Sequence, residues 1–332
     1  MQRVRFGVIG LGRFGEMHCE ALSSIPEVEL AALCTRNEDR LRAHGARFKV
    51  ERLHTDYRLM LADPTIDAVS IVTMWDQHAA PAIAALEAGK HVFIEKPLAS
   101  TVDDCAAIIR ARDASGKFAM AGQICRFNPR FAAAKREIEA GAVGRIVSIY
   151  ARRNIPAAVS ESVLAKIGPI AGDGVHDTDL MLWFTGGRIR SAYAQSLSVR
   201  GLRNPDIGWT MYRFECGAIG VLENAWFLPQ GTPYRIDERM EILGTEGCIS
   251  IQESGPAISV CGKDGWRAPD TTYWPLAGGA RVGALRDELR YFACCVRDGR
   301  APDVVTLEEA AEAVRACLAA EQSAATGRVV GL

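Results

Sequence analysis

The chain has 332 residues, of which 48% are hydrophobic, and a formal net charge of −1. This length allows one large or two ordinary domains, and we expect two. The absence of a basic, aromatic-rich face argues against nucleic acid as a partner, and no apolar run is long enough to cross a bilayer. We therefore expect a cytoplasmic protein whose partner is a small molecule, with neither nucleic acid nor membrane involved.

The first third of the chain alternates apolar, β-rich runs with helical patterns. The predicted strands are 4–10, 28–34, 68–74, 91–97 and 117–125, and the predicted helices are 15–25, 37–48, 78–89 and 101–116. Continuous apolar strands separated by helices are typical of a parallel sheet that is buried on both faces. Residues 1–124 are therefore predicted to form an α/β domain with a doubly wound parallel sheet.

From residue 125 the pattern changes to that of an α+β domain. A helix at 129–141 and a strand at 145–154 precede strand patterns at 189–199, 209–217, 218–228, 239–254 and 256–262. Apolar residues at every second position, with Gly-rich turns between the runs, indicate an antiparallel sheet. Two helical patterns follow, and we expect this tail, about 284–327, to pack back at the domain seam. Residues 125–332 form the predicted second domain.

Ten cysteines and six histidines are dispersed along the chain. There is no C-x-x-C pair and no Cys/His spacing that suits zinc. We therefore expect reduced thiols and no metal site.

A glycine-rich turn, G-L-G-R-F-G, joins the first predicted strand to the first predicted helix. The first glycine permits a tight turn, the second lets backbone approach a pyrophosphate, and the third allows close helix packing. The helix N-terminus supplies N–H groups and positive potential. The turn is therefore predicted to bind a dinucleotide through Gly10, Leu11, Gly12, Arg13, Phe14 and Gly15.

The end of the second predicted strand bears on the choice of cofactor. NAD proteins usually place an acid there, whereas NADP proteins need a cation for the 2′-phosphate. This chain has Thr35 and Arg36 in that place, and both suit a phosphate. We expect an NAD(P) cofactor with NADP(H) slightly favoured over NAD(H). If the strand ends later, an acid or amide at 37–39 provides a ribose contact instead.

Several motifs occur in order over nearly the whole chain. They are G-L-G-R-F-G, I-D-A-V-S-I-V-T with His78, Glu95-Lys96-Pro97, R-F-N-P, G-V-H-D-T-D-L-M-L-W-F-T-G and G-T-E-G. Together they resemble the glucose-fructose oxidoreductase, inositol dehydrogenase and rhizopine-catabolism (Gfo/Idh/MocA) family, and the E-K-P triplet is the most diagnostic. The resemblance implies a Rossmann domain, then a domain with an open, mainly antiparallel sheet, with nicotinamide and substrate meeting between them. The implied reaction is hydride transfer at a carbinol carbon of a sugar, sugar derivative or cyclitol.

The resemblance also implies roles for single residues. Lys96 matches a lysine that contacts substrate and the nicotinamide ribose and assists proton transfer, and Pro97 matches a proline that often follows a cis peptide bond. Thr73, His78 and Glu95 are expected at the cofactor with them. For His78 an ordinary loop histidine, satisfied by its surroundings, is the alternative.

The stretch around His176 reads as the start of a helix that ends at Gly186-Gly187. Hydride loss from a carbinol requires that its hydroxyl also lose a proton, so His176 and Lys96 are the two candidate acid/base groups. The positive potential at the helix N-terminus favours a neutral imidazole. The family commonly has an aspartate four residues before this histidine, where this chain has Gly172. Asp173 is expected to be either catalytic or only the helix N-cap.

Three further polar residues are weaker substrate candidates, namely Arg126, Asn128 and Arg153. If several arginines converge there, an acidic or phosphorylated sugar substrate is favoured. Family members usually cover the open sheet with another subunit, so we expect a homodimer or homotetramer through the C-terminal sheet. Two alternative functions remain open: a dinucleotide-binding regulator without turnover, and an NAD-assisted glycoside hydrolase.

Overall fold

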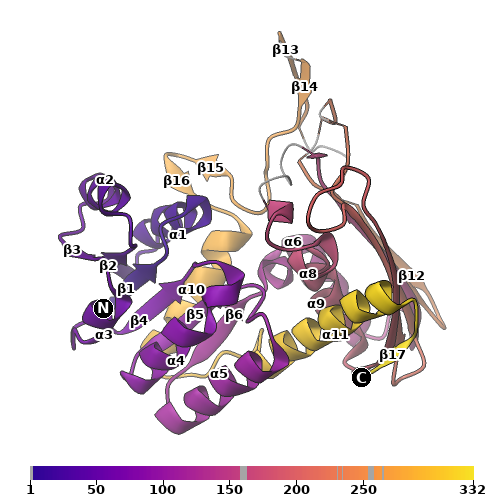
Figure 1. Cartoon of the computed structure of the whole chain (residues 1–332), viewed down its shortest axis with the longest axis horizontal. Helices are drawn as coiled ribbons and strands as arrows, with labels where there is room; N and C mark the ends of the chain where they lie inside the picture. Colours follow the sequence, from indigo (N-terminus) through magenta and orange to yellow (C-terminus); the bar gives the residue numbers. More distant parts are fainter. Residues whose placement is uncertain (1–2, 158–162, 230, 234, 253–257, 264) are drawn as a thin grey trace. The chain divides into compact units, whose positions relative to one another are not determined.

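The computed structural model describes residues 3–157, 163–229, 231–233, 235–252, 258–263 and 265–332 (Figure 1). The chain divides into two compact units. The first contains Met1–Asn128 and Thr272–Ala311, and the second contains Pro129–Thr271 and Glu312–Leu332. The sequence pattern instead placed all of 125–332 in one domain.

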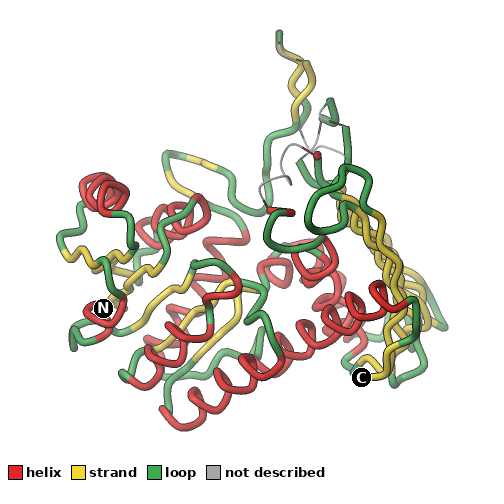
Figure 2. Tube along the Cα trace, in the orientation of Figure 1, coloured by secondary structure: helices red, strands yellow, loops and turns green. Residues whose placement is uncertain are grey.

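The first unit is built on a six-stranded, wholly parallel sheet (Figure 2). Its strands, in chain order, are β1 (Val4–Ile9), β2 (Val28–Cys34), β3 (Arg52–His54), β4 (Ala68–Ile71), β5 (His91–Glu95) and β6 (Ala119–Gly122). The order across the sheet is β3-β2-β1-β4-β5-β6, so the winding reverses between β1 and β4. The predicted doubly wound sheet is confirmed, and this reversal is where open α/β sheets bind ligands.

Helices cover both faces of this sheet, because successive right-handed crossovers run in opposite directions from β1 and β4. The helices are α1 (Arg13–Ser23), α2 (Glu38–Phe48), α3 (Tyr57–Leu61), α4 (Ala79–Glu87), α5 (Val102–Ser115) and α10 (Ala284–Asp298), with short 3-10 turns η1 (Trp75–Gln77) and η2 (Ile124–Phe127). A two-residue-strand hairpin, β15 (Leu276–Ala277) and β16 (Ala280–Arg281), precedes α10. Helix α10 packs against α1, and α4 packs against α5 on the other face (Figure 1).

Aromatic packing explains why Thr272–Ala311 belongs to the first unit. Phe292 of α10 is fully buried, with its ring 6.2 Å from that of Phe6 and 5.9 Å from that of Phe93. These two rings come from β1 and β5, so α10 completes the core beneath the sheet. Aromatic pairs in such edge or tilted arrangements add to the stabilisation from burial.

The second unit is built on a seven-stranded sheet in the order β12-β11-β7-β10-β9-β8-β17. Its strands are β7 (Ile146–Asn154), β8 (Ile189–Leu197), β9 (Ile207–Phe214), β10 (Ile219–Ala225), β11 (Asp237–Gly244), β12 (Cys248–Gln252) and β17 (Val330–Gly331). Only β7 and β10 pair in parallel among these neighbours. The predicted mainly antiparallel sheet is confirmed, and the strand pattern predicted at 239–254 is the hairpin β11–β12, its last two residues lying outside the described ones.

The helices of the second unit lie on one face of its sheet, where α8 and α9 pack against β7, β9 and β10. They are α6 (Pro129–Glu139), α8 (Pro169–Gly172), α9 (Gly174–Thr185) and most of α11 (Leu307–Thr326), whose first residues, up to Ala311, belong to the first unit. A small hairpin is formed by β13 (Val260–Gly262) and β14 (Gly265–Arg267). The C-cap of α9 is Gly186 in the left-handed conformation (φ 59°), as predicted.

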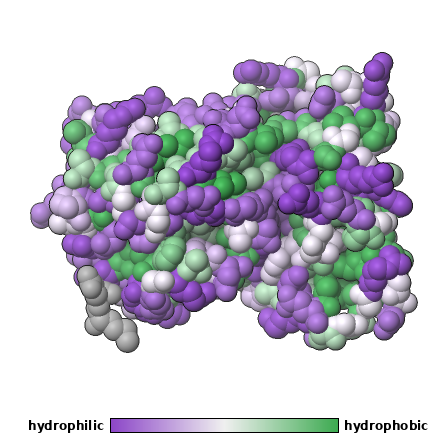
Figure 3. All heavy atoms as spheres, turned by 90° about the horizontal axis from the view of Figure 1, so that it is seen from below, coloured by the Kyte–Doolittle hydropathy of each residue, from purple (hydrophilic) through white to green (hydrophobic). Residues whose placement is uncertain are grey.

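In the described part of the chain no helix combines the length and the apolar character that crossing a membrane requires. Polar and apolar residues are interspersed on the face shown in Figure 3.

Candidate active site

The glycine-rich turn between β1 and α1 is shaped by the protein's own backbone at two of its three glycines. Gly10 has φ 99°, and a Cβ built on it would lie 2.6 Å from the carbonyl oxygen of Val72. A Cβ on Gly15 would lie 1.9 Å from the carbonyl oxygen of Gly10. Any side chain at these positions would force the turn open, so both glycines are needed for the turn to form.

Gly12 is different, because a Cβ built on it meets no described atom within 4 Å. It is the N-cap of α1, and no side chain forms a capping hydrogen bond there. The space above Gly12 and the first N–H groups of α1 are therefore available to a ligand rather than to the protein. These residues fit the pyrophosphate of a dinucleotide.

The turn lies at the same edge of the sheet as the other predicted cofactor residues. In the register of the parallel strands Ile9 pairs with Ile71, and Ile71 pairs with Ile94. The segments that follow β1, β4 and β5 therefore emerge side by side, and they bring together Gly10–Gly15, Thr73, His78, Glu95, Lys96 and Pro97. Leu11 is buried in the core, so only its backbone can face a ligand. That these residues bind the cofactor stays a prediction.

The segment after β2 contains the residues predicted to choose the cofactor. The strand ends at Cys34, and Arg36 is exposed, with Nη2 3.3 Å from Oε1 of Gln77. Asn37 caps α2, because its side chain accepts the N–H of Arg40. Glu38 and Asp39 form ion pairs with Arg42. The side chains at 37–39 thus have partners within or at the start of α2. Thr35 and Arg36 are the residues that directly follow β2 at the sheet edge.

The turn that carries Lys96 is tied to a buried polar cluster. The Lys96–Pro97 peptide bond is cis, as the resemblance implied. The N–H of Lys96 donates to Oε2 of Glu95 at 3.1 Å, and Oε1 of Glu95 lies 3.1 Å from Nε2 of His18. The other ring nitrogen of His18 lies 2.9 Å from Oγ of Ser70. No sequence motif indicated His18 or Ser70, although His18 lies three residues after Gly15 on the inner face of the first helix.

Glu288 of α10 extends this cluster. It is fully buried, and neither of its carboxyl oxygens has a hydrogen-bond partner among the described residues. Burial, together with the charge of Glu95, raises the pKa of Glu288 well above its ordinary value. Glu288 therefore favours its protonated, uncharged form.

The protonation of Glu288 predicts how stability depends on pH. Its unfolded-state pKa is near 4.5 and its folded-state pKa is higher, so this group's relative contribution to stability is complete below pH 4.5 and is lost as pH rises towards the folded-state value. Glu288→Gln replaces the carboxyl group with an amide of nearly the same size that stays uncharged at every pH. The gain in unfolding free energy of Glu288→Gln over wild type should therefore grow between pH 5 and pH 8 in urea titrations. Exposed Glu87→Gln on α4 is the control, and an equal gain at every pH would contradict this account.

His176 lies in the first turn of α9 and is 7% exposed. Asp173 occupies the N-cap position of α9, but its side chain makes no capping hydrogen bond. Of the two roles left open for Asp173, the side-chain helix cap is therefore absent. The single turn α8 leads directly into α9, and the N–H of Asp173 bonds to the carbonyl of Pro169. Whether Asp173 takes part in catalysis stays a prediction.

The space beside Gly172, the glycine that departs from the family pattern, is filled by the residue that follows β10. A Cβ on Gly172 would lie 2.6 Å from Cη2 of Trp226, whose side chain is 2% exposed. A Cβ on Gly174 would lie 2.6 Å from Oδ1 of Asn224. The indole of Trp226 thus takes the space that an acid at position 172 would need, and the two glycines let the start of α9 lie directly on β10.

Arg153, a predicted substrate residue, is held inside the second unit. Its Nε donates to Oδ2 of Asp177 at 2.7 Å, and it also pairs with Glu238. All three side chains are almost fully buried. Burial raises the pKa of Asp177 to about 6, against the lowering effect of Arg153. The arrangement ties α9, through the residue after His176, to β7 and β11, and it accounts for Arg153 without a substrate.

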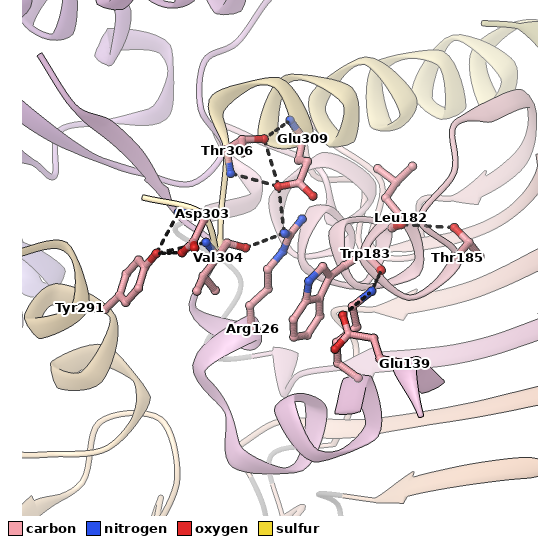
Figure 4. A network of polar contacts seen from close by, with 11 residues as sticks. Arg126, Glu139, Leu182, Trp183, Thr185, Tyr291, Asp303, Val304, Thr306 and Glu309 are labelled. Atoms are coloured by element: carbon pink, nitrogen blue, oxygen red, sulfur yellow. Dashed lines mark hydrogen bonds and ion pairs between the residues drawn. The ribbon is translucent and has the colours of Figure 1, made fainter. Parts of the chain in front are cut away.

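Arg126 is also engaged within its own unit (Figure 4). Its Nη1 donates to the carbonyl of Val304 at 2.8 Å and to Oε2 of Glu309 at 3.1 Å. Glu309 in turn accepts the N–H and hydroxyl of Thr306. Asn128 is fully buried. Arg126 therefore anchors the segment before α11, and a substrate contact by Arg126 or Asn128 stays a prediction.

Two parts of the chain match models of known protein families. Residues 4–123 match the model of an oxidoreductase family with an NAD-binding Rossmann fold, and residues 131–250 match the GFO/IDH/MocA C-terminal domain. The chain is 31% identical over 324 residues to scyllo-inositol 2-dehydrogenase (NAD(+)) of Bacillus subtilis (strain 168), covering 92% of this chain and 90% of that protein. It is 28% identical over 310 residues to myo-inositol 2-dehydrogenase of Thermotoga maritima, covering 91% and 90%.

The fold of the whole chain is also similar to that of a solved structure. Myo-inositol 2-dehydrogenase from Lactobacillus plantarum superposes with a TM-score of 0.87 at 25% identity, covering 100% of both chains. The sequence motifs, the glycine turn at the sheet reversal and both domain matches agree: this chain belongs to the Gfo/Idh/MocA family of oxidoreductases.

Proposed function

We propose that this protein is an NAD-dependent dehydrogenase that interconverts a carbinol and a carbonyl on an uncharged cyclitol, of the inositol type. The observation that carries the proposal is the open space at Gly12, at the same sheet edge as the Lys96 turn. The relatives support the substrate class, because those named above are inositol dehydrogenases. The regulator and glycoside-hydrolase alternatives gain no support from them.

A bound nicotinamide supplies the hydride acceptor at its C4. The protein must then remove the proton of the reacting hydroxyl, since a carbinol that loses hydride alone would leave a protonated carbonyl. We assign that proton to His176, near the N-terminus of α9. Lys96 orients and polarises the same oxygen as negative charge develops on it. Asp173, one turn before His176, is the group that we propose to orient the imidazole or bind a second hydroxyl.

The charges of the described residues favour an uncharged substrate. Arg153 is paired with two carboxylates, and Arg152 donates to Asp237 at 2.9 Å. Arg126 is paired with Glu309. The arginines that would recognise a carboxylate or phosphate are thus already matched by acids.

A substrate panel tests the proposed function. Cyclitols, neutral sugars, sugar acids and sugar phosphates are each mixed with NAD or NADP, and reduced cofactor is followed by absorbance. The proposal expects the highest kcat/KM with an uncharged cyclitol. Turnover of acids or phosphates alone would contradict the assigned substrate class, and cofactor binding without turnover of any compound would contradict the reaction.

The comparisons do not support the preference for NADP(H) that Thr35 and Arg36 suggested. The family is described by NAD binding, and the Bacillus subtilis relative is named for NAD(+). We therefore propose NAD(H) as the working cofactor, with Arg36 providing weaker acceptance of the 2′-phosphate.

Arg36→Ala should lower the affinity for NADPH by about tenfold to a hundredfold, because one charge-assisted contact is lost, and should leave the affinity for NADH unchanged. Fluorescence titration with each reduced cofactor measures both constants. The control is Arg42→Ala, since Arg42 lies close by on α2 and is paired with Glu38 and Asp39. Tighter NADPH than NADH binding in the wild type would overturn the assignment of NAD(H).

We also propose that a second copy of the chain covers the outer face of the seven-stranded sheet, giving a homodimer or homotetramer. Residues alternate along β9, so that Tyr212 is buried while Trp209 and Met211 are 46% and 49% exposed. Met211 lies between Tyr193 of β8 and Val221 of β10 in the register. A row of apolar side chains on an open sheet is typical of a subunit interface, and sedimentation equilibrium measures the oligomeric state directly.

A further inference from the structure

The turn that carries Lys96 is held on both sides by buried polar side chains. On one side Oε2 of Glu95 accepts the N–H of Lys96 at 3.1 Å. On the other side Nδ1 of His78 lies 2.9 Å from the carbonyl oxygen of Pro97. Glu95 is 6% exposed and His78 is 1% exposed. Lys96 therefore lies between two anchored backbone groups.

The ring of His78 lies between two loops at the sheet edge. Its Nε2 lies 3.2 Å from the carbonyl oxygen of Thr73, which follows β4, whereas Pro97 follows β5. These two strands are neighbours in the sheet. Burial lowers the pKa of His78, so the ring is neutral and has one N–H. We assign that N–H to Nδ1, because its contact with Pro97 is the shorter one.

Glu95 is fixed by a second layer of residues. Its Oε1 lies 3.1 Å from Nε2 of His18, and the other nitrogen of His18 lies 2.9 Å from Oγ of Ser70 in β4. Both carboxylate oxygens of Glu95 therefore have partners inside the first unit, and Nδ1 of His78 donates to Pro97. A neutral ring cannot also donate from Nε2 to Thr73, but His78 is only 1% exposed and Glu95 6%, so the protein itself encloses both side chains.

We propose that His78 and Glu95 are positioning residues, which together form a clamp that fixes the backbone of Lys96 and touches neither cofactor nor substrate. The proposal rests on the proposed function, in which Lys96 acts on the reacting hydroxyl. It replaces the expectation that both residues contact the cofactor. A clamp of this kind affects turnover through the placement of Lys96, because small displacements of a reacting group have large effects on rate.

A set of His78 variants tests the clamp. His78→Ala should lower kcat by about tenfold to a hundredfold while the dissociation constant for NADH stays unchanged. His78→Asn should recover most of the loss, because its amide lies where Nδ1 was and can donate to Pro97. His78→Gln should recover less, because its amide reaches the position of Nε2, next to Thr73. The control is His91→Gln at the other end of β5, where Nδ1 accepts the N–H of Phe118.

A second readout does not depend on turnover. Hydrogen–deuterium exchange of a peptide covering 93–99 should be faster in His78→Ala than in wild type, and near wild type in His78→Asn. Weaker NADH binding with unchanged kcat would show a cofactor contact and overturn the clamp. Unchanged exchange in His78→Ala would also overturn it, as would equal losses of kcat in the Ala and Asn variants at equal thermal stability. If wild type turns over no substrate, the proposed function fails, and the exchange result still decides whether His78 holds the turn.

Discussion

Replacing Lys96 with methionine, or His176 with glutamine, should lower kcat by about a hundredfold to ten-thousandfold, the range expected when a group that exchanges or stabilises a proton is lost. The affinity for NADH should change little, since the glycine turn and α1 remain intact. Stopped-flow absorbance gives kcat, and fluorescence titration gives the dissociation constant.

Lys117→Met is the matched control for this pair. Lys117 lies in the same unit, just before β6 begins at Ala119, and therefore at the opposite edge of the sheet from Lys96. It should keep wild-type turnover. Near-normal kcat in both Lys96→Met and His176→Gln would refute the assignment of the two residues. A loss in only one of them would leave that residue as the single acid/base group.

The second large effect concerns the glycine turn, where two substitutions should separate folding from binding. Gly15→Ala places a methyl group against the carbonyl oxygen of Gly10 and should destabilise the protein by about 3 kcal/mol. A Cβ at position 12 meets no described atom within 4 Å, so Gly12→Val should cost much less stability than Gly15→Ala, whereas its affinity for NADH should fall by about tenfold or more. Thermal unfolding with and without NADH measures both quantities.

Two results would contradict these roles of Gly12 and Gly15. If Gly12→Val bound NADH as tightly as wild type, the space above Gly12 would not be the pyrophosphate site. If Gly15→Ala were as stable as wild type, the close approach of α1 to the turn would not limit the fold.

The sequence predicted most elements of both sheets because their residues repeat with a clear period. β2, for example, was predicted at 28–34 and is Val28–Cys34. β3 and α3 were not predicted, because three and five residues are too few to show a period. The return of α10 to the first unit depends on Phe292 meeting Phe6 and Phe93, and no local pattern encodes such a long-range contact.

In the candidate site, too, the sequence predicted what depends on local motifs and not what depends on long-range contacts. The motifs identified Lys96, His176 and the glycine turn, since each has a fixed place in the chain. They did not show which way a side chain turns: Arg153 and Glu95 were expected at ligands, and the structure shows that each has polar partners inside the fold. Their contact with a ligand stays a prediction. The sequence also showed a glycine at position 172, but not why a larger residue is excluded there. The indole of Trp226 fills that space, and Trp226 comes more than fifty residues later in the chain.

The most direct test of the central claim is the fate of the hydrogen on the reacting carbon. An inositol carrying deuterium on its carbinol carbons is oxidised with NAD, and the reduced cofactor is analysed by mass spectrometry. The account predicts that one deuterium is transferred to the nicotinamide ring and that the Lys96→Met and His176→Gln variants carry out the same transfer more slowly. Reduced cofactor without deuterium, or release of the deuterium into water, would contradict direct hydride transfer from a carbinol carbon.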